Sequence, residues 1–159
     1  MITLIRRSFN FNPTTIARIA CSRNTHSHKL SAIPPGYEPY GVAGEFDRMN
    51  GQLYYRQADG RYGWLATEKH TNMNGIIHGG FLMLLADDFL GHEVMRQCKH
   101  TKVVTVNLDV KFLAAARVGD WLEGVVDIPK MTRSFAFPRG TIFRHGGDPV
   151  LMASGVWKI

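Results

Sequence analysis

The sequence predicts an α+β domain in which an antiparallel sheet curls around one buried helix. Three observations support this: a hairpin signal before residue 70, one long apolar segment from residue 80, and four strand-like runs after residue 102. A helix that is apolar all round has to be covered, and in a small protein a sheet usually covers it. The predicted order is therefore a hairpin, one helix and an antiparallel meander.

The composition fits one soluble globular domain. The chain has 159 residues, of which 45% are hydrophobic and 20% charged, and two domains of this total length would each have a small core. No apolar run approaches the roughly 20 residues that a membrane-spanning helix needs, so we expect no membrane partner. Cys21 and Cys98 form neither a disulfide framework nor a metal-ligand spacing. A reducing compartment such as the cytoplasm is the simplest location.

The positive charge is concentrated in the N-terminal segment. The net charge is +6, and residues 1–37 contain no acid and five cations: Arg6, Arg7, Arg18, Arg23 and Lys29. The remainder of the chain therefore carries only +1, the difference between +6 and +5. A nearly neutral body argues against nucleic acid as a partner, because DNA-binding domains carry a basic face.

Residues 1–44 are predicted to be a basic tail followed by a linker. Basic, hydroxyl-rich and acid-free composition is typical of a mitochondrial transit peptide, so the alternative location in a eukaryote is the mitochondrion. A tail that lies against the domain and a start codon assigned too far upstream are two other interpretations. Residues 31–44 are rich in proline and glycine, which favours a linker. The folded domain is predicted to span residues 45–159.

The first elements of the domain are a hairpin and a polar loop. Residues 53–56 and 62–66 are strand-like and flank Asp59-Gly60, a strong turn signal. Residues 70–77 are polar and rich in turn formers, so we expect a loop between the hairpin and the helix.

One helix is predicted over residues 80–96, about 25 Å long. Residues 81–86 are apolar on all sides, so we expect the first turns to be buried all round. Asp87 and Asp88 follow directly. Because an unpaired buried carboxylate is costly, two acids in the middle of such a helix indicate a functional or a paired role.

Four strand-like runs follow the helix, at residues 103–113, 121–128, 134–143 and 150–159. Turn residues mark the expected corners: Gly119-Asp120, Pro129-Lys130 and Gly146-Gly147-Asp148-Pro149. The first run alternates, with Val104, Val106, Leu108, Val110 and Phe112 on one face and Thr105, Asn107, Asp109 and Lys111 on the other. Such alternation predicts a strand with one covered face.

The segment before the helix carries the most specific motif. Its parts are Asn72, Gly75, His78-Gly79-Gly80 and, nine residues after the histidine, Asp87. Together with the strand at 104–108 and the segment at 116–120, this pattern resembles the signature of PaaI-like hotdog-fold acyl-CoA thioesterases. The resemblance covers roughly residues 50–159. It implies an α+β hotdog fold, a curved antiparallel sheet wrapped around one long central helix. His-Gly-Gly alone is not specific, because residues 145–147 repeat it at an expected hairpin corner.

The two glycines at the helix start suit an oxyanion site. The N–H groups of Gly79 and Gly80 lie in the first turn, where they have no helical partner. Glycine lets a bulky thioester approach the backbone closely, and a carbonyl held there is stabilised most as it becomes an oxyanion. Asp87 lies eight residues beyond Gly79, about 12 Å along the axis. It cannot reach a carbonyl at the start of its own helix.

That distance leaves two interpretations of Asp87. Either the acid is structural, or the site combines Gly79 of one chain with Asp87 of another. A twofold dimer with antiparallel central helices would form two such sites. The resemblance implies the same arrangement, so we expect a homodimer or a homotetramer made of two dimers.

The resemblance also implies roles for individual residues. Asp87 matches the catalytic carboxylate, acting as general base toward water or as nucleophile. Gly79 matches the oxyanion donor, supplied by the partner subunit. His78 and Asn72 match residues that shape the site and orient water and thioester, and Thr105 lies where a serine or threonine is common near the acid. No cofactor or metal is implied.

Three further residues are assigned to substrate binding: Gly80, Asp88 and Arg117. Arg117 lies near a strand end, where it could meet CoA phosphates, with solvated surface as its alternative. Asp88 has His92 four residues on, a spacing that allows a structural pair on the helix surface. Asn72 could equally serve only as a turn former.

The sequence therefore predicts an acyl-CoA thioesterase that hydrolyses a thioester to free acid and CoA. The alternative is a non-catalytic acyl-CoA sensor on the same fold. Regulators of that type usually carry a helix-turn-helix segment, and residues 1–44 are too broken by proline for one. A dehydratase acting on β-hydroxyacyl thioesters is a third reading, whose histidine–acid signature the motif does not match.

Overall fold

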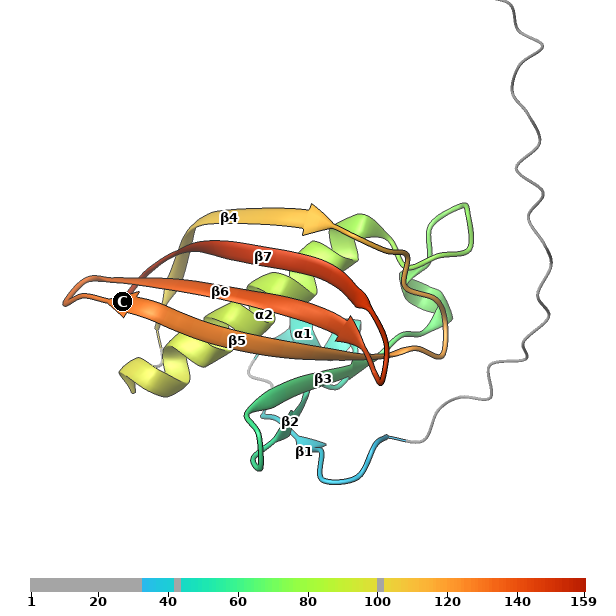
Figure 1. Cartoon of the computed structure of the whole chain (residues 1–159), viewed down its shortest axis with the longest axis horizontal. Coiled ribbons are helices and arrows are strands. Elements are labelled where there is room, and N and C mark those ends of the chain that lie inside the picture. Colours follow the sequence, from blue (N-terminus) through green and yellow to red (C-terminus); the bar gives the residue numbers. More distant parts are fainter. Residues whose placement is uncertain (1–32, 42–43, 100–101) are drawn as a thin grey trace, which may run out of the picture.

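A curved antiparallel sheet wraps one face of a long helix in the computed structural model, which describes residues 33–41, 44–99 and 102–159 (Figure 1). The elements in chain order are β1 (Glu38–Pro39), α1 (Glu45–Asn50), β2 (Tyr54–Arg56), β3 (Arg61–Leu65), the 3₁₀ turn η1 (Glu68–His70), α2 (Gly79–Cys98), β4 (Val104–Phe112), β5 (Trp121–Met131), β6 (Phe135–Arg144) and β7 (Pro149–Lys158). The sheet order is β1-β2-β3-β5-β6-β7-β4. The predicted α+β hotdog architecture is confirmed.

The predicted hairpin and helix are also confirmed. Strands β2 and β3 pair antiparallel, and Gly60 adopts a φ of 69° in the turn between them. Glycine takes this left-handed conformation at no steric cost, which explains the turn. Helix α2 exceeds the predicted range by one residue at its start and ends at Cys98, before Lys99 in the left-handed conformation.

The predicted meander is wrong for its first strand. Strand β4 does not pair with β5; it pairs with β7 and forms an edge of the sheet. The connection at 113–120 carries the chain across the end of the sheet, so that β5 pairs with β3 on one side and β6 on the other. Alternation in a sequence reports which face is covered, but it does not report which strand is the neighbour.

The predicted corner at Pro129-Lys130 is likewise wrong. Strand β5 continues through both residues to Met131, and the pairing with β6 shifts register between Asp127 and Lys130. Proline lacks the N–H that a ladder needs, so it is tolerated inside a strand only at a bulge or an edge. Pro129 lies at such a bulge, and the chain turns after Met131 instead.

Two short elements were not predicted. Strand β1 pairs with β2, so that two residues of the predicted linker belong to the sheet. Helix α1 has six residues and begins with a backbone bond from Gly44 to the Asp47 carboxylate at 3.2 Å. Neither segment is long enough to show a period, although Gly44 followed by acids is a pattern found at helix starts.

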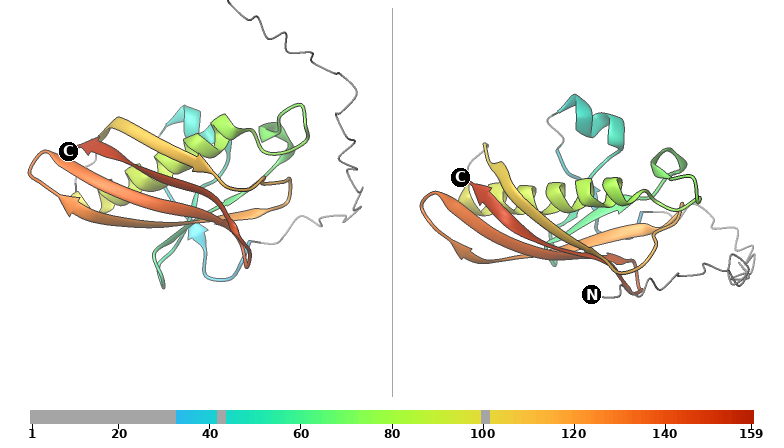
Figure 2. Two further views of the ribbon diagram at one scale, coloured as in Figure 1. Left: turned by 45° about the horizontal axis from the view of Figure 1, so that its top comes forward. Right: turned by 90° about the horizontal axis from the view of Figure 1, so that it is seen from above.

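Helix α2 packs very closely on the sheet at Gly124. The buried residues of α2 are Leu82, Leu85, Ala86, Phe89, Leu90, Gly91, Glu93 and Val94. A methyl group on Gly124 would overlap the Phe89 ring, so the strand and the helix meet where one of them has no side chain. The expectation that the first turns of α2 are buried all round is wrong, because Met83 is 38% exposed and Leu84 is half-buried. The sheet covers only one face of α2 (Figure 2).

A β-bulge changes which way the residues of β4 point. Pairing with β7 shifts register between Thr105 and Asn107, so Val106 is an extra residue. A bulge of one residue reverses the alternation on one side of it. Thr105 therefore faces α2, as Leu108 does, whereas simple alternation placed these two residues on opposite faces. Val106 is left 59% exposed.

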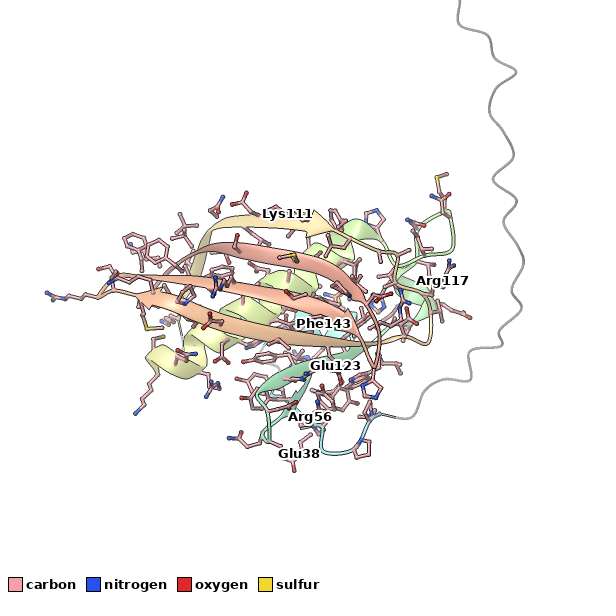
Figure 3. The ribbon with its side chains drawn as sticks, in the orientation of Figure 1. Glu38, Arg56, Lys111, Arg117, Glu123 and Phe143 are labelled. Atoms are coloured by element: carbon pink, nitrogen blue, oxygen red, sulfur yellow. The ribbon has the colours of Figure 1, made fainter. Side chains whose placement is uncertain are left out.

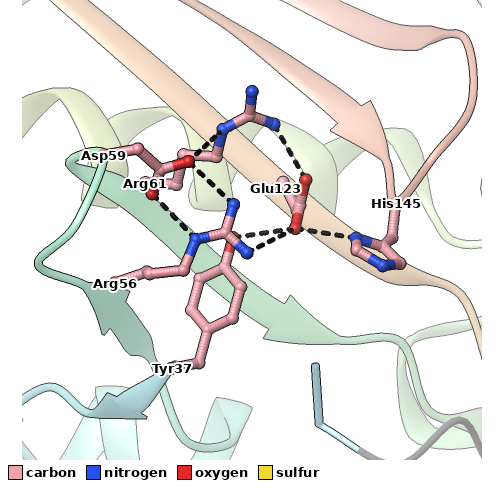
Figure 4. Close-up of polar contacts among 6 residues, drawn as sticks. All are labelled: Tyr37, Arg56, Asp59, Arg61, Glu123 and His145. Atoms are coloured by element: carbon pink, nitrogen blue, oxygen red, sulfur yellow. Dashed lines mark hydrogen bonds and ion pairs between the residues drawn. The ribbon is translucent and has the colours of Figure 1, made fainter. Parts of the chain in front are cut away.

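A buried carboxylate joins the β1–β3 end of the sheet to β5 and the β6–β7 turn (Figure 4). Glu123 is 2% exposed and contacts the Tyr37 hydroxyl, Arg61 and His145, each at 2.9 Å. Arg56 lies 3.8 Å away. Burial opposes ionisation of Glu123, but the hydrogen bonds from His145 and Tyr37 prevail and hold its pKa below the usual value. The ionised group ties Tyr37, just before β1, to the central strands.

Replacing Gly124 by alanine is expected to destabilise the protein by about 1–3 kcal/mol, because the new methyl group overlaps Phe89 in a close-packed core. Urea unfolding measures the effect. Gly41→Ala is the matched control, since a Cβ there meets no atom of the described residues within 4 Å. Equal stability of the two variants would show that the helix and the sheet can separate without cost.

Candidate active site

The loop before α2 is held as a closed turn by its own backbone. The His78 N–H donates to the His70 carbonyl at 2.8 Å, and the Asn72 N–H donates to the Ile76 carbonyl at 2.8 Å. Gly75 takes a φ of 70° between them, a conformation that favours glycine. These bonds fix the direction in which the chain enters the helix, which is why the motif places a glycine here.

Asn72 serves as a turn former and also lines a pocket. Its side-chain oxygen accepts the N–H of Asn74 at 2.9 Å, the predicted turn role. Asn72 also lines a pocket of about 340 Å³ together with Gly79 and Phe112. The side-chain amide donates no hydrogen bond within the described part of the chain, so it is left for a ligand in that pocket. The two predicted roles of Asn72 are thus compatible.

His78 caps the helix and thereby distinguishes the two glycines. Its Nδ1 accepts the Gly80 N–H at 2.9 Å. An imidazole that accepts at Nδ1 has its donor N–H at Nε2, so the ring of His78 serves here as the cap of the helix. The Gly80 N–H is therefore occupied. The Gly79 N–H, in contrast, donates to no acceptor among the described residues, and it points out of the first turn.

Asp87 and Thr105 form a hydrogen-bonded pair between α2 and β4. The Thr105 hydroxyl donates to Asp87 Oδ1 at 2.8 Å, in an exposed position. The pair depends on the bulge at Val106, which turns Thr105 toward the helix. One carboxylate oxygen is thereby fixed by the hydroxyl, and the other stays available.

Gly79 and Asp87 face the same side of α2. Gly79 lies beside the Phe112 ring, near the end of β4, and Asp87 contacts Thr105 near its beginning. The two residues are eight positions apart, about 12 Å along the helix. Strand β4 pairs only with β7 in the described residues, so its other edge is open. The structure thus brings both halves of the predicted site to one open edge, and it does not bring them together.

Asp88 lies on a different face of α2, under α1. It lines a small cavity with Asp47 and His92, and burial together with the charges of Asp47 and Asp87 raises its pKa to about 7. The predicted pair between Asp88 and His92 is not formed in the described residues. The His92 ring instead packs edge-on against Tyr40, with the ring centres 5.1 Å apart, and burial lowers its pKa.

A second pocket, which the sequence did not indicate, lies between α1 and the start of α2. It has a volume of about 360 Å³, and its lining includes Phe46, Lys69, His70 and Phe81. His70 is 7% exposed, and its Nδ1 lies 2.8 Å from the Thr67 hydroxyl. Burial lowers the pKa of His70, so this ring is a neutral part of the wall. Phe46 and Asn50 of α1 form part of this pocket, and the sequence could not predict the pocket because it did not predict α1.

Arg117 lies close to the loop that carries Asn72. The Ile77 N–H donates to the Ala116 carbonyl at 2.9 Å, which joins the 72–77 loop to the 113–120 connection. The Arg117 side chain is exposed at this end of the sheet (Figure 3). Arg117 does not line the Gly79 pocket, whose lining on this connection extends to Ala115, so its contact to CoA phosphates stays a prediction.

Comparison with known proteins assigns the family. Residues 74–150 match the family described as Thioesterase superfamily. Over 132 residues the chain is 34% identical to the Pseudomonas aeruginosa protein named "Putative esterase PA0474", covering 80% of this chain and 97% of that protein. The chain belongs to the thioesterase superfamily. The name of this family and that of the relative support hydrolase chemistry at the level of the family.

Solved structures of this superfamily share the fold. The chain resembles the Escherichia coli PaaI protein with a TM-score of 0.58 at 19% identity, over 62% of this chain and 70% of that one. It resembles a Streptococcus pneumoniae hypothetical thioesterase, solved with coenzyme A, with a TM-score of 0.58 at 21% identity, over 62% and 76% of the two chains. The PaaI-like hotdog fold predicted for this thioesterase superfamily member is confirmed.

Two kinds of feature are absent from the described ranges of this member of the thioesterase superfamily. Residues 33–41, 44–99 and 102–159 contain no group of three or more histidine, cysteine or acidic side chains placed to hold a metal ion. No helix in these ranges is both long and apolar enough to cross a membrane.

Asp88→Asn is expected to stabilise the protein at about pH 8 and to have little effect near pH 4. The unfolded chain ionises an aspartate near its ordinary pKa of about 4, whereas folded Asp88 keeps its proton until about pH 7. Because the folded state binds more protons in this window, the stability of the wild type falls as the pH rises through it. Asparagine does not titrate, so the stability of Asp88→Asn relative to the wild type should increase between about pH 4 and pH 7 and stay constant above pH 7.

Urea unfolding at a series of pH values and one protein concentration measures this gain. Asp148→Asn, in the exposed β6–β7 turn, is the control for loss of one carboxylate at the surface. Parallel pH profiles for wild type and Asp88→Asn would contradict the burial of an ionisable group at this position.

Proposed function

We propose that this protein is an acyl-CoA thioesterase whose active site is shared between two subunits. The observation that carries the proposal is the placement of Gly79 and Asp87. Both face the open edge beside β4, one with an N–H that has no acceptor among the described residues and the other with a carboxylate. The distance of about 12 Å separates them within one chain, so a second chain is needed to complete the site.

A twofold axis beside β4 would join these halves. If the two β4 strands pair antiparallel, the sheet continues into the partner and the two α2 helices run antiparallel. Each Gly79 would then meet the Asp87 side of the partner's helix, which gives two sites per dimer. Pairing would also cover the exposed apolar residues on and next to β4, Val104 at 63%, Val106 at 59%, Phe112 at 52% and Leu113 at 48%. An apolar edge strand of this kind is otherwise a liability.

The Gly79 N–H would stabilise the oxyanion. A thioester carbonyl placed at the start of α2 accepts this N–H, and the positive end of the helix dipole adds to the field there. Negative charge grows on that oxygen as the tetrahedral intermediate forms, so the interaction is strongest in the transition state. His78 supports the donor by occupying the neighbouring Gly80 N–H, which leaves Gly79 as the one oriented toward substrate.

Asp87 would supply the attack on the thioester. As a general base it takes a proton from water through the oxygen that Thr105 leaves available, and the hydroxide adds to the carbonyl carbon. Collapse of the intermediate breaks the carbon–sulfur bond, and the proton on Asp87 passes to the departing CoA thiolate. As a nucleophile, the Asp87 carboxylate would instead attack the carbonyl carbon, the carbon–sulfur bond would break with departure of the CoA thiolate, and water would then cleave the resulting anhydride to release the acid. The arrangement supports either route.

Asp87, and not Asp88, is the acid that we assign to catalysis. A pKa of about 7 would suit a general base, and by that criterion Asp88 would be the choice. A base must also lie within about 3 Å of the water that it activates. Asp88 faces the cavity under α1, on a different face of α2 from the open edge where the partner's Gly79 is expected. The position of Asp87 at the open edge therefore decides the choice, although the pKa of Asp88 would suit a base better.

The proposed substrate carries CoA. The Streptococcus pneumoniae neighbour was solved with coenzyme A, which supports a CoA ester here. Arg117, exposed beside the loop that carries Asn72, is a cation near the mouth of the Gly79 pocket, and an arginine pairs well with phosphate.

Gly79→Pro and Asp87→Asn are each expected to lower kcat by about 10²–10³-fold, because each removes one group that acts on the transition state. Proline at the first helical position removes only an N–H that the helix does not use. The preceding residue, His78, already has the extended backbone that proline requires, with φ −62° and ψ 134°. Thiol release from a panel of acyl-CoAs measures kcat. Gly79→Ala keeps the N–H and should lose much less activity than Gly79→Pro, since its Cβ makes ordinary contact with Phe112 at 3.5 Å.

The two inactive variants, Gly79→Pro and Asp87→Asn, also test whether the site is shared between subunits. When they are co-expressed with different affinity tags and purified through both tags, each mixed dimer holds one intact Gly79–Asp87 pair and should recover about half of the wild-type kcat. Mixed dimers as inactive as the separate variants would place both groups within one subunit. A wild type that binds acyl-CoA without releasing thiol would overturn hydrolysis and favour a non-catalytic binding protein.

Arg117→Ala is expected to raise KM for acyl-CoA by about tenfold with little change in kcat, because CoA phosphates bind equally in the ground state and the transition state. The effect should shrink as ionic strength increases. Arg133→Ala, an exposed arginine between β5 and β6, is the control and should leave KM unchanged. If both substitutions change KM for acyl-CoA equally, Arg117 is an ordinary solvent-exposed residue and does not bind CoA.

A further inference from the structure

The indole of Trp157 fills the space between α2 and strand β7. Trp157 is 1% exposed. A Cβ on Gly91 of α2 would lie 3.3 Å from the indole Nε1, and a Cβ on Gly155 of β7 would lie 2.7 Å from Cζ3 of the same ring. The ring therefore reaches from its own strand to the helix, and a glycine lies at each of these two contacts. Because neither glycine has a side chain, the indole sets how closely the helix approaches the strand at this point.

Trp157 lies next to the Asp87–Thr105 pair. It is the cross-strand partner of Thr105, so the two side chains lie on the same face of the sheet with their Cβ atoms about 5 Å apart. Gly91 follows Asp87 by four residues and therefore lies on the same face of α2, one turn further along. The indole thus contacts the helix directly beyond the acid, and it leaves the sheet directly beside the hydroxyl that binds the acid.

Strand β4 itself gives this pair little support. The strand is an edge of the sheet and pairs with β7. The residues on either side of Thr105, Val104 and Val106, are 63% and 59% exposed, so they do not pack against the helix. The separation of Thr105 from α2 is therefore set through β7, and Trp157 is the residue of β7 beside Thr105 that reaches the helix.

The hydrogen bond between Thr105 and Asp87 is sensitive to this separation. Its length is 2.8 Å, and hydrogen bonds between two oxygens weaken beyond about 3.0 Å. A shift of α2 by about 0.5 Å relative to β4 is enough to spoil the placement of a catalytic group. A cavity left by a smaller side chain lets its surroundings relax inward. The size of the residue at position 157 therefore controls how Asp87 is held.

We propose that Trp157 is a positioning residue for the acid, and that its indole is the spacer that holds α2 and β4 at the separation where Thr105 binds Asp87. One carboxylate oxygen is then oriented by the hydroxyl, and the other is presented to the reacting water. This inference rests on the proposed thioesterase function, in which Asp87 is the base or the nucleophile. It adds a residue of the core that acts through Thr105 and not on the substrate.

Trp157→Phe is expected to lower kcat by about tenfold and to leave KM for acyl-CoA within about twofold, because the acid is misplaced while the substrate contacts are kept. Thiol release measures both constants. In the Thr105→Val background, which lacks the hydroxyl, the same substitution should lower kcat by less than about twofold further. If the two effects on kcat multiply in the double variant, Trp157 does not act through Thr105 and the inference is overturned.

Trp121→Phe is the matched control. Trp121 is also buried, at 2% exposed, but its ring packs on Tyr37, with the ring centres 5.0 Å apart, outside the core around α2. The substitution should lower the stability to urea, as Trp157→Phe does, and leave kcat unchanged. An equal fall of kcat in the two variants would reduce the role of Trp157 to general stability.

Gly91→Ala changes the same spacing from the helix side, and it keeps the test possible if Trp157→Phe does not fold. The new methyl group lies 3.3 Å from Nε1, which is tighter than ordinary contact, so it pushes α2 away from the indole. The expected fall of kcat is about three- to tenfold. In Gly91→Ala/Trp157→Phe the smaller ring can move toward Gly155 and make room for the methyl group, so kcat should exceed that of Trp157→Phe alone. A double variant less active than Trp157→Phe would contradict the spacer.

Crystal structures separate this inference from the function that it rests on. The distance from Thr105 Oγ1 to Asp87 Oδ1 is 2.8 Å, and it should exceed about 3.5 Å in Trp157→Phe. An unchanged distance overturns the spacer, even in an active enzyme. If the wild type hydrolyses no acyl-CoA, the proposed function fails, and the measured distance still decides whether Trp157 holds the pair.

Discussion

The rotation of α2 about its own axis is the constraint on which the site depends. Close packing at Gly124 and Phe89 fixes that rotation, because the strand and the helix meet where no side chain separates them. Neighbouring residues of a helix point about 100° apart. Asp87 and Asp88 therefore enter different surroundings: one faces β4 and solvent, and the other faces α1. Two acids of the same kind acquire different chemistry from one packing contact.

The network around Glu123 acts at the opposite side of the sheet. It links Tyr37 before β1 to β5 and the β6–β7 turn through one ionised carboxylate. The linked strands form the end of the sheet farthest from β4. One end of the sheet is thus held by buried charge and hydrogen bonds. The other end is left open, which is where a second subunit can add strands.

The sequence predicted the elements of this fold more accurately than their neighbours. The apolar helix, the Asp59-Gly60 hairpin and the His78-Gly79-Gly80 start were evident because each depends on residues close in the chain. The position of β4 beside β7 depends on a crossing that no local pattern records. The direction of Thr105 was wrong for a similar reason, since a bulge is defined by the partner strand. Asp88 was mistaken for the partner of His92 because α1, six residues long, gave no periodic signal.

The bulge at Val106 also makes the length of β4 relative to β7 matter for function. The strand is anchored to α2 through Thr105 on one side of the extra residue and through Leu108 on the other. Insertion of one residue in β7 opposite Val106 would restore regular pairing, and alternation from Leu108 would then turn Thr105 away from Asp87 and a valine toward it. The two strands would then pair more regularly, but Asp87 would lose the hydroxyl that orients it. Relatives that keep this chemistry are therefore expected to tolerate substitutions in both strands far more readily than an insertion in β7 opposite the bulge.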